Sequence, residues 1–548
     1  MTTDFRPVST EPMSGAGDQP ADVASVYREE SQRFVWTVLA LYVAFVSTLT
    51  AFHEAWKDET QAWRLAVDSH GLRQLARNAR YEGHPLLFHL IVQELGHLSR
   101  SWWALATLHT VIASLAAWIV LRYAPFTRLQ KVLLVFGYWM AYEYAVVVRP
   151  YGLGMMLAFA ACVAWSARPR RIGWAAFFLV LLANTTAMGT LLAMTLALAF
   201  GADWGWPDGG GPRPSRRSSV IGGGIAAVAT AFVLFIAAEQ IKPPADAGYQ
   251  GEARAPETLS AWDVGAMPTV ELRALVPVVR YEDGVVQWNR WLLKPESRTV
   301  LGALLLSSLA ALAIGAIIAS RRRMALILFT VGTTGFLLFF GLLFSGTAHH
   351  HGYLFLVWAL SAWLAWSDVP TAWRGSLQRL SDFLETKRRR LFTLSLVLPV
   401  VATIELAVAD LFTPFADARH VADIIQAEGL QNATIIAIVR SHAQAVGAFL
   451  DRPVLYPREG IERRFVVWGA ESPYRETVRA ADSALTVRLT RECRVVLIAS
   501  PSKDVPTSVA SRARLIYTTP RRPMSGDRYR VWVATAPDSV RCASGRRP

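Results

Sequence analysis

Long apolar segments alternate with short polar stretches through the first three quarters of the chain. A helix that crosses a membrane needs about 20 mostly apolar residues, and eleven segments come near that length. A cleavable signal peptide would place its apolar run nearer the start. We therefore interpret the first apolar segment as a retained helix, and the polar residues 1–33 before it as a disordered tail. The predicted spans are 34–52, 102–121, 131–148, 151–167, 172–185, 187–203, 219–240, 299–319, 324–345, 351–367 and 391–412.

One further apolar segment, His84–Leu98, is shorter than these spans. It carries three His residues and a Glu, which suit the membrane surface better than its interior. We predict a re-entrant or interfacial helix there.

Basic residues gather in the loops on one side of the predicted membrane. With the N-terminus inside, these loops hold 18 Lys and Arg residues against five acids, whereas the opposite loops, 53–100 and 241–298, are nearly balanced. Because cytoplasmic loops are enriched in Lys and Arg, we expect a cytoplasmic N-terminal tail, with both long loops and the C-terminus outside. The basic loops are 122–131, 168–171, 203–217, 320–323 and 368–390.

The pattern changes near Thr413, where hydrophobic residues come in short runs bounded by polar ones. The stretch from Ala433 through Ser441–Leu450 to Pro453–Tyr456 is typical of a strand, a helix and a second, parallel strand. Residues 413–548 are therefore predicted to form a soluble, extracytoplasmic α/β domain of ordinary size. Its other apolar runs are Phe465–Trp468, Arg494–Ser500 and Tyr529–Val533.

Composition agrees with a membrane protein. Hydrophobic residues make up 53% of the chain and charged residues 18%, against about a quarter charged in soluble chains. The net charge of +14 comes from 56 Lys and Arg residues, many in runs between apolar segments. Topology explains it better than a nucleic-acid partner. Three Cys residues exclude a disulfide scaffold. Cys493 and Cys542 both lie in the predicted outer domain, and the sequence does not decide whether they form a disulfide bond.

The first outer loop, 53–100, holds an acidic pair, Asp58–Glu59, just outside the first span. A carboxylate there is a candidate general base, because it can take a proton from a hydroxyl as the hydroxyl attacks. A solvated acidic loop is the plainer interpretation. The neighbouring Trp56 and Trp63 favour packing against the membrane, where carboxylates tend to be functional. Further candidates in this loop are His53, Glu54, Glu82 and His84.

A second candidate cluster lies at the outer end of the third span, where Tyr142–Glu143–Tyr144 leads to Arg149–Pro150–Tyr151. Arg149 has no basic neighbours and lies on the side that the charge rule disfavours. Its planar guanidinium group is suited to binding a phosphate. Snorkelling to the interface, or a pair with Glu143, is the structural alternative.

A third cluster is the run His349–His350–His351, followed by Gly352, again on the outer side. Three consecutive His residues do not share a helical face, so this run alone is not expected to form a three-His metal site. One or two of them could orient a phosphate or join carboxylates around a divalent metal. A purely structural run is the alternative.

The outer loop 241–298 combines bases with Trp. Such a segment suits the headgroup region near a lipid phosphate, although an ordinary interface helix fits as well. The residues concerned are Trp262, Trp288, Trp291, Arg280, Arg290 and Lys294.

No P-loop, dinucleotide GxGxxG or HExxH motif occurs in the sequence, so an ATP-driven pump is not expected. Transporters usually show internal repeats and charged or broken spans near the midplane. These spans carry little such charge and show no clear repeat, which leaves a secondary transporter or flippase as an alternative.

Taken in order, these motifs resemble the GT-C superfamily of membrane glycosyltransferases, which includes protein O-mannosyltransferases and the lipid A aminoarabinose transferase. The resemblance covers roughly 34–412. The matching pieces are Asp58–Glu59, Glu82–Gly83–His84–Pro85, Arg149–Pro150–Tyr151 and His350–His351–Gly352.

The resemblance implies transfer of a sugar from a polyprenyl-phosphate donor to an extracytoplasmic glycan, lipid or protein, usually with inversion. It implies Asp58 as the base, with Glu59 second, and Arg149 and His350 on the donor phosphate. His349, Tyr151, Arg290 and Lys294 are further phosphate-binding candidates. A bacterial inner (plasma) membrane is the expected location, and a related glycan ligase or polymerase is another alternative.

Overall fold

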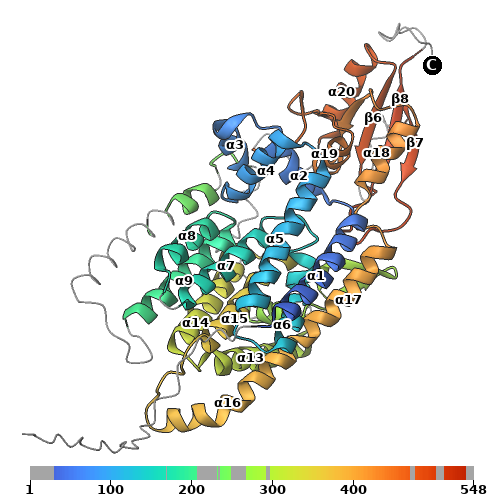
Figure 1. Ribbon diagram of the computed structural model, residues 1–548. Coiled ribbons are helices and arrows are strands. Elements are labelled where there is room, and N and C mark those ends of the chain that lie inside the picture. The colour runs from blue at the N-terminus through green and yellow to red at the C-terminus, as the bar shows by residue number, and fades with distance from the viewer. Residues whose placement is uncertain are drawn as a thin grey trace, which may run out of the picture.

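The structure is a computed structural model that combines a helical bundle with a smaller α/β unit at one end (Figure 1). Three short helices, α2 (Lys57–Val67), α3 (Gly71–Ala79) and α4 (Leu87–Leu98), lie at the same end of the bundle as the α/β unit. We call this the loop end. The structure describes residues 30–167, 170–205, 231, 235–242, 244–247, 267–291, 297–469, 476–501 and 511–537, without the side chains of 289–291.

Six helical segments among the described residues are long and apolar enough to cross a membrane, and two shorter apolar helices accompany them. Together they indicate an integral membrane protein and match eight of the eleven predicted spans. Segment 219–240 lies mostly outside the described residues. The eight are α1 (Gln32–Phe52), α5 (Trp102–Tyr123), α9 (Ala187–Gly205), α13 (Arg298–Ala319), α14 (Arg323–Leu338) with the π-helix η3 (Phe339–Leu343), the pair α16 (Ser376–Ser395) and α17 (Val397–Phe412), and the shorter α7 (Tyr151–Ser166) and α8 (Ile172–Ala183).

The prediction of one continuous helix over 131–148 is wrong. Helix α6 (Arg128–Val135) ends early, and a single π-helical turn, η1 (Trp139–Glu143), follows it. Residues 137–155 are all buried. The run is apolar because other helices enclose it, and an apolar segment alone does not distinguish a protein interior from lipid.

Helix α15 (Ala348–Trp366), predicted from residue 351, is buried along its whole length and packs against α7, α9, α13 and α14. It is therefore the central helix of the bundle. The three consecutive His residues form its first turn, where Thr347 caps the helix by accepting and donating hydrogen bonds with His350.

The described residues of the loop 241–298 contain a β-hairpin, where a headgroup-lying segment or an interface helix was expected. Strands β1 (Val279–Glu282) and β2 (Val285–Trp291) pair antiparallel through a turn at Asp283–Gly284, both with positive φ, as a two-residue hairpin turn requires. Trp288 is 1% exposed and belongs to the core. Before the hairpin, α12 (Thr269–Leu275) packs on α15.

The C-terminal unit is a six-stranded mixed sheet with the order β5-β4-β3-β6-β8-β7. The predicted strand, helix and parallel strand are confirmed as β3 (Thr434–Ala437), α19 (Arg440–Phe449) and β4 (Val454–Tyr456). Apolar clusters cover both faces of the sheet, as parallel strands require. The remaining elements are α18 (Ala418–Ala427), β5 (Ile461–Arg463), α20 (Val478–Leu489), β6 (Arg494–Ala499), β7 (Ala513–Thr518) and β8 (Arg530–Thr535).

Two details of this unit bear on the sequence interpretation. The apolar run Phe465–Trp468 is not a strand, and Val466 contacts helix α2 instead. Cys493 is disulfide-bonded, whereas Cys542 lies outside the described residues.

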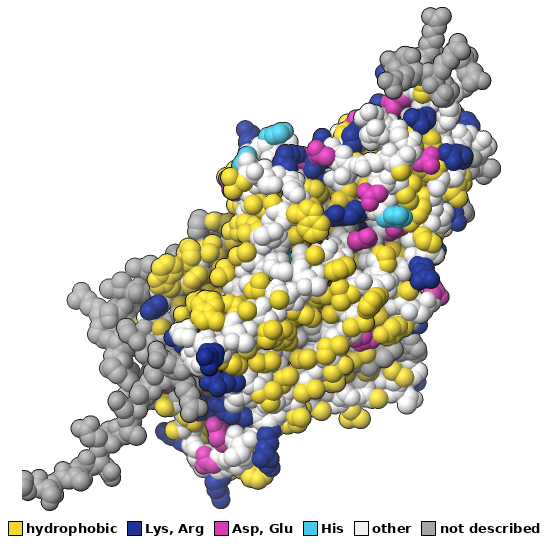
Figure 2. Space-filling view, turned by 45° about the vertical axis from the view of Figure 1, so that its right-hand side comes forward, with side chains coloured by type: hydrophobic (Ala, Val, Ile, Leu, Met, Phe, Trp, Pro, Cys, Tyr) yellow, Lys and Arg dark blue, Asp and Glu magenta, His cyan; other side chains and the backbone are white. Residues whose placement is uncertain are grey.

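The described parts of the basic loops lie at the end of the bundle opposite the loop end, where Lys and Arg gather on the surface below a broad apolar belt (Figure 2). Ion pairs join the N-terminal segment to the loop after α5 through Glu30 and Arg128, and Arg170 and Arg322 share Asp203. The described parts of these segments therefore lie on one side of the bundle, as predicted.

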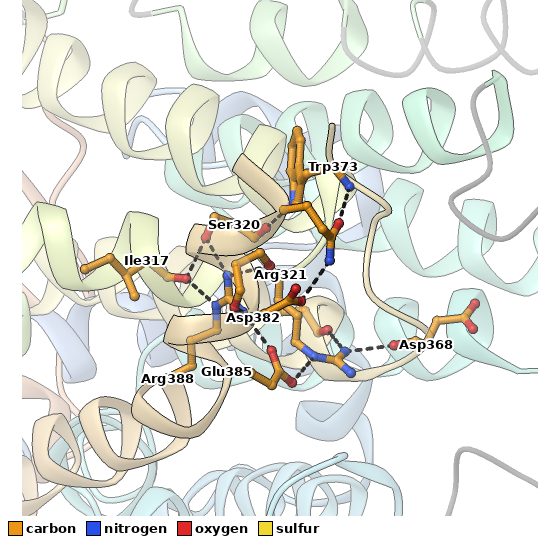
Figure 3. Close-up of polar contacts among 11 residues, drawn as sticks. Ile317, Ser320, Arg321, Asp368, Trp373, Asp382, Glu385 and Arg388 are labelled. Carbon is orange, nitrogen blue, oxygen red and sulfur yellow. Dashed lines mark hydrogen bonds and ion pairs between the residues drawn. The ribbon is translucent and has the colours of Figure 1, made fainter. Parts of the chain in front are cut away.

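The segment 368–390, predicted as a loop, is helical from Ser376 onward as α16. Arg388 is buried and donates to the carbonyl of Ile317, which lies in the last turn of α13 (Figure 3). Arg321 and Arg388 both bind Glu385. A cation at a helix C-terminus is stabilised by the helix dipole, so these bases hold the α13–α14 turn against α16.

Candidate active site

The acidic pair lies in the first turn of α2, and its two carboxylates have different surroundings. Glu59 is fully buried. Its Oε2 accepts from the backbone N–H of Trp56 at 2.7 Å, as a glutamate at the third helical position does in a capping box. Its Oε1 accepts from the N–H of Val148 at 2.6 Å. Glu59 therefore joins the start of α2 to the segment that leads to Arg149.

Asp58 is partly exposed, and its carboxylate has no hydrogen-bond partner among the described residues. Arg149 Nη1 donates to the backbone oxygen of Asp58 at 2.7 Å. Burial raises the pKa of Asp58 above its usual range, and the charges of Arg149 and Lys57 offset part of this rise. A carboxylate with a raised pKa and free oxygens is suited to accept a proton.

Glu82 lies close to the same arginine. Gln61 on α2 donates to Glu82 Oε1 at 2.9 Å. Burial raises the pKa of Glu82 to about 7, while the Gln61 hydrogen bond and the charge of Arg149 act in the opposite direction. Arg149 thus lies near two carboxylates that are both harder to ionise than usual.

Two imidazoles from the first outer loop lie near Arg149. Burial and the charge of Arg149 lower the pKa of His84 to about 3 and that of His89 to about 4, so both are neutral at pH 7. Both ring nitrogens of His89, Nδ1 of His84 and Nε of Arg149 have no hydrogen-bond partner among the described residues. Buried polar atoms are rarely left without partners, and donors grouped around a guanidinium group are suited to bind an anion.

Aromatic and imidazole rings form the wall beside Arg149. The ring of Tyr151 lies 5.2 Å from that of His349 and 5.6 Å from that of His350, between ring centroids. His349 also stacks on Trp288, with an interplanar angle of 11°. Burial and the charge of Arg149, among other groups, lower the pKa of His349 well below its usual value, and burial with the neighbouring His349 does the same for His350.

Of the sequence candidates, the structure brings Asp58, Glu82, His84 and Arg149 together, with the rings of Tyr151, His349 and His350 beside them. His53 points elsewhere: its ring bonds to Glu59 at 3.2 Å and to Asp410 on α17 at 3.0 Å.

The other candidates do not join this group. Glu54 faces Asp417 and Arg419 at the start of the C-terminal unit. The side chain of Arg290 and the whole of Lys294 lie outside the described residues. Glu143, the alternative partner of Arg149, instead accepts from Trp288 and Tyr138.

Three residues near the site went unnoticed in the sequence. Asp410 is a charged residue within a predicted span, and such residues usually carry a function or a buried partner, so it could have been found. Lys57 pairs with Asp527 of the C-terminal unit at 2.6 Å. No local signal connects residues 470 positions apart.

A metal site is not evident in the part of the chain that the structure describes. No group of three or more His, Cys, Asp or Glu side chains there has the arrangement needed to hold a metal ion.

No protein-family model and no curated protein matches this sequence. Among solved structures, the chain is similar to ArnT from Cupriavidus metallidurans bound to undecaprenyl phosphate, with a TM-score of 0.50 and 11% identity over 92% of this chain and 98% of that one. The apo state of the same protein matches with a TM-score of 0.48 and 12% identity over the same shares. The first likeness shows that this chain has the ArnT fold over nearly its whole length, in agreement with the GT-C resemblance.

Proposed function

We propose that this protein is a membrane glycosyltransferase that moves a sugar from a polyprenyl-phosphate-linked donor to an acceptor outside the cytoplasm. The observation that carries the proposal is the position of Arg149, which binds the backbone oxygen of Asp58 and acts by its charge on the neutral side chains of His84 and His89. The ArnT structure of the same fold holds undecaprenyl phosphate, which is a ligand of the class proposed here.

The proposed reaction assigns one task to each side of the site. Asp58 takes the proton from the attacking group of the acceptor as that group forms a bond to the anomeric carbon of the sugar. The bond between that carbon and the phosphate oxygen breaks, and both of its electrons leave with the polyprenyl phosphate. The charge that develops on the leaving phosphate is stabilised by the guanidinium group of Arg149 and by N–H groups of the neighbouring imidazoles. Attack on the face opposite the phosphate would invert the anomeric centre.

The location of the site agrees with a lipid-linked substrate. A sugar on a long isoprenoid cannot leave the bilayer, so its enzyme needs a site at headgroup depth. Asp58 follows α1 by a few residues and Arg149 precedes α7, so both lie at the loop end of the bundle. In this proposal the basic end faces the cytoplasm and the C-terminal unit lies outside a bacterial inner membrane.

A transfer assay in lipid nanodiscs tests the proposal. The purified protein would be given radiolabelled undecaprenyl-phosphate hexoses and pentoses, with an envelope fraction from cells that lack the protein as the source of acceptor. We expect one donor to lose its label to the acceptor fraction and to release undecaprenyl phosphate, and Asp58→Asn to slow both about 10²-fold or more. Unchanged transfer by Asp58→Asn would reject this base.

The rival functions give other results in the same preparation. Solute counterflow in proteoliposomes without any lipid-linked sugar, together with no transfer from any donor, would indicate a transporter. Transfer only from donors that carry a preassembled glycan on a pyrophosphate would indicate a ligase or polymerase.

A further inference from the structure

The C-terminal unit packs directly on helix α2, whose first turn carries Asp58. Backbone N–H and C=O of Val466 bond to the side-chain amide of Gln61 at 2.9 and 2.7 Å. The contacts continue along the helix with an ion pair between Arg64 Nη2 and Asp451 at 2.8 Å. The unit therefore holds the helix that carries the proposed base along its first two turns.

The contact nearest the base is the ion pair between Lys57 and Asp527, with Nζ and Oδ1 2.6 Å apart. The side chain of Lys57 is 18% exposed and that of Asp527 6%. Lys57 immediately precedes Asp58 in the chain, and its charge acts on the Asp58 carboxylate. An ammonium group on this flexible stem would be drawn to Asp58 if Asp527 were not there.

Both cations near Asp58 are thus directed at oxygens other than its carboxylate. Lys57 binds Asp527, and Arg149 binds the backbone carbonyl of Asp58. A base paired closely with a cation has a lower pKa and is a weaker proton acceptor. The free carboxylate of Asp58 therefore depends on where these two cations are held.

We propose that Asp527 is a positioning residue for the active site: by holding Lys57, it keeps the Asp58 carboxylate without a fixed counter-ion and able to take a proton. This inference rests on the proposed function. It gives the C-terminal unit a task in the chemistry, although no described residue of that unit bonds to the Asp58 carboxylate.

The other charged groups around this pair do not replace Asp527. Asp58 is also influenced by Arg149, Glu59 and Glu82, but these come from elements of the bundle and the first outer loop. On the other side of the pair, His442 Nε2 lies 3.9 Å from Asp527 Oδ1. Burial lowers the pKa of His442 to about 4, so it is neutral at pH 7 and does not compete with Lys57 for Asp527.

A second contact of the C-terminal unit acts on Glu82, the other carboxylate near Arg149. Gln61 Nε2 donates both to the carbonyl of Val466 and to Glu82 Oε1. The C-terminal unit thereby orients the amide that binds Glu82. Both carboxylates near Arg149 thus depend on α2 side chains that this unit fixes.

The test is the pH profile of transfer by Asp527→Asn. With Lys57 released, we expect the acid limb of the profile to move to lower pH by about one unit, since an opposite charge within a few ångströms lowers a carboxyl pKa by about one to three units. The rate at pH 7 should fall about threefold to tenfold, because a less basic carboxylate is a weaker general base. Asp527→Glu keeps the charge and should retain most of the wild-type profile.

Two further variants separate positioning from folding. Asp451→Asn removes an ion pair on the same docking face, away from Asp58, and should leave the profile unchanged. The double variant Lys57→Gln with Asp527→Asn has no ammonium to release and should return the acid limb toward that of the wild type. Thermal unfolding of each variant shows whether it is folded.

The inference is overturned if folded Asp527→Asn keeps the wild-type profile, or if the double variant shows the same shift as the single one. Absence of transfer by the wild type with every donor would instead count against the proposed function.

Discussion

The two adjacent carboxylates of α2 should respond in opposite ways to loss of charge. Glu59 is fully buried and accepts from two backbone N–H groups and from His53. Glu59→Gln keeps one accepting oxygen but places an amide NH₂ against a donor. Hydrogen bonds to charged groups contribute about 1.5–3 kcal/mol each, and removal of one partner from a buried charged group costs about 3–5 kcal/mol. We expect Glu59→Gln to lose several kilocalories per mole of stability.

Asp58→Asn should behave differently. The Asp58 carboxylate has no hydrogen-bond partner to lose among the described residues, and burial raises its pKa, so its charge opposes folding at pH 7. The variant should be as stable as the wild type or more so. Its transfer rate should fall about 10²-fold to 10⁴-fold, the usual contribution of a general base.

Two measurements on both variants test the assignment of Glu59 as structural and Asp58 as the base. They are thermal unfolding in detergent and sugar transfer from the active donor. Binding of undecaprenyl phosphate adds a third measurement: Asp58→Asn should retain it, whereas Glu59→Gln should weaken it by releasing the segment that holds Arg149. A stable and active Glu59→Gln together with an unstable Asp58→Asn would refute the division of roles between the two residues.

Three other predictions follow from the charges around the site. Arg149→Lys should weaken binding of undecaprenyl phosphate about tenfold or more, because an ammonium group cannot bind phosphate through a planar fork while bonding to Asp58; native mass spectrometry with that lipid measures this. The pKa of Glu82 is about 7, so Glu82 is neutral below pH 7 and anionic above it; affinity for the same lipid should fall as pH rises through 7, and Glu82→Gln should abolish that dependence. Burial lowers the pKa of His53, but Asp410 and Glu59 outweigh burial and raise it to about 10. Protonated His53 therefore stabilises the fold, fully below about pH 6.5, and this contribution is lost as pH rises to about 10. The thermal midpoint should decline over that window, and His53→Gln should flatten the decline.

Hydrophobic patterning predicted most of the fold, and it failed where burial in protein resembles burial in lipid. Eight predicted spans are apolar helices, and the change of pattern near Thr413 marks the start of the α/β unit. The segment 131–148 has the composition of a span but folds as two short helical pieces. Its tyrosines and Glu143 have partners inside the protein, which no count of apolar residues reveals.

The site was predictable as a set of residues and not as a set of roles. The carboxylates of the loop 53–100, Arg149 and the histidines were found because polar groups next to spans are uncommon and tend to be functional. Asp58 and Glu59 differ because Glu59 accepts from the N–H of Val148, whereas Lys57 beside Asp58 is paired with Asp527. Those contacts depend on segments that are distant in sequence, and the pairing of Lys57 with Asp527 spans almost the whole chain.

Helix geometry explains how two neighbouring carboxylates come to differ. Consecutive residues on an α-helix are rotated by about 100° around its axis, so in the first turn of α2 the side chain of Glu59 is buried in the protein while that of Asp58 stays partly exposed. The buried Glu59 accepts N–H groups that the helix start leaves unpaired, and in doing so fixes the backbone beside Asp58. One helical turn therefore supplies both a structural acid, Glu59, and a free base, Asp58. The C-terminal unit adds Asp527, which pairs with Lys57, the lysine that precedes them.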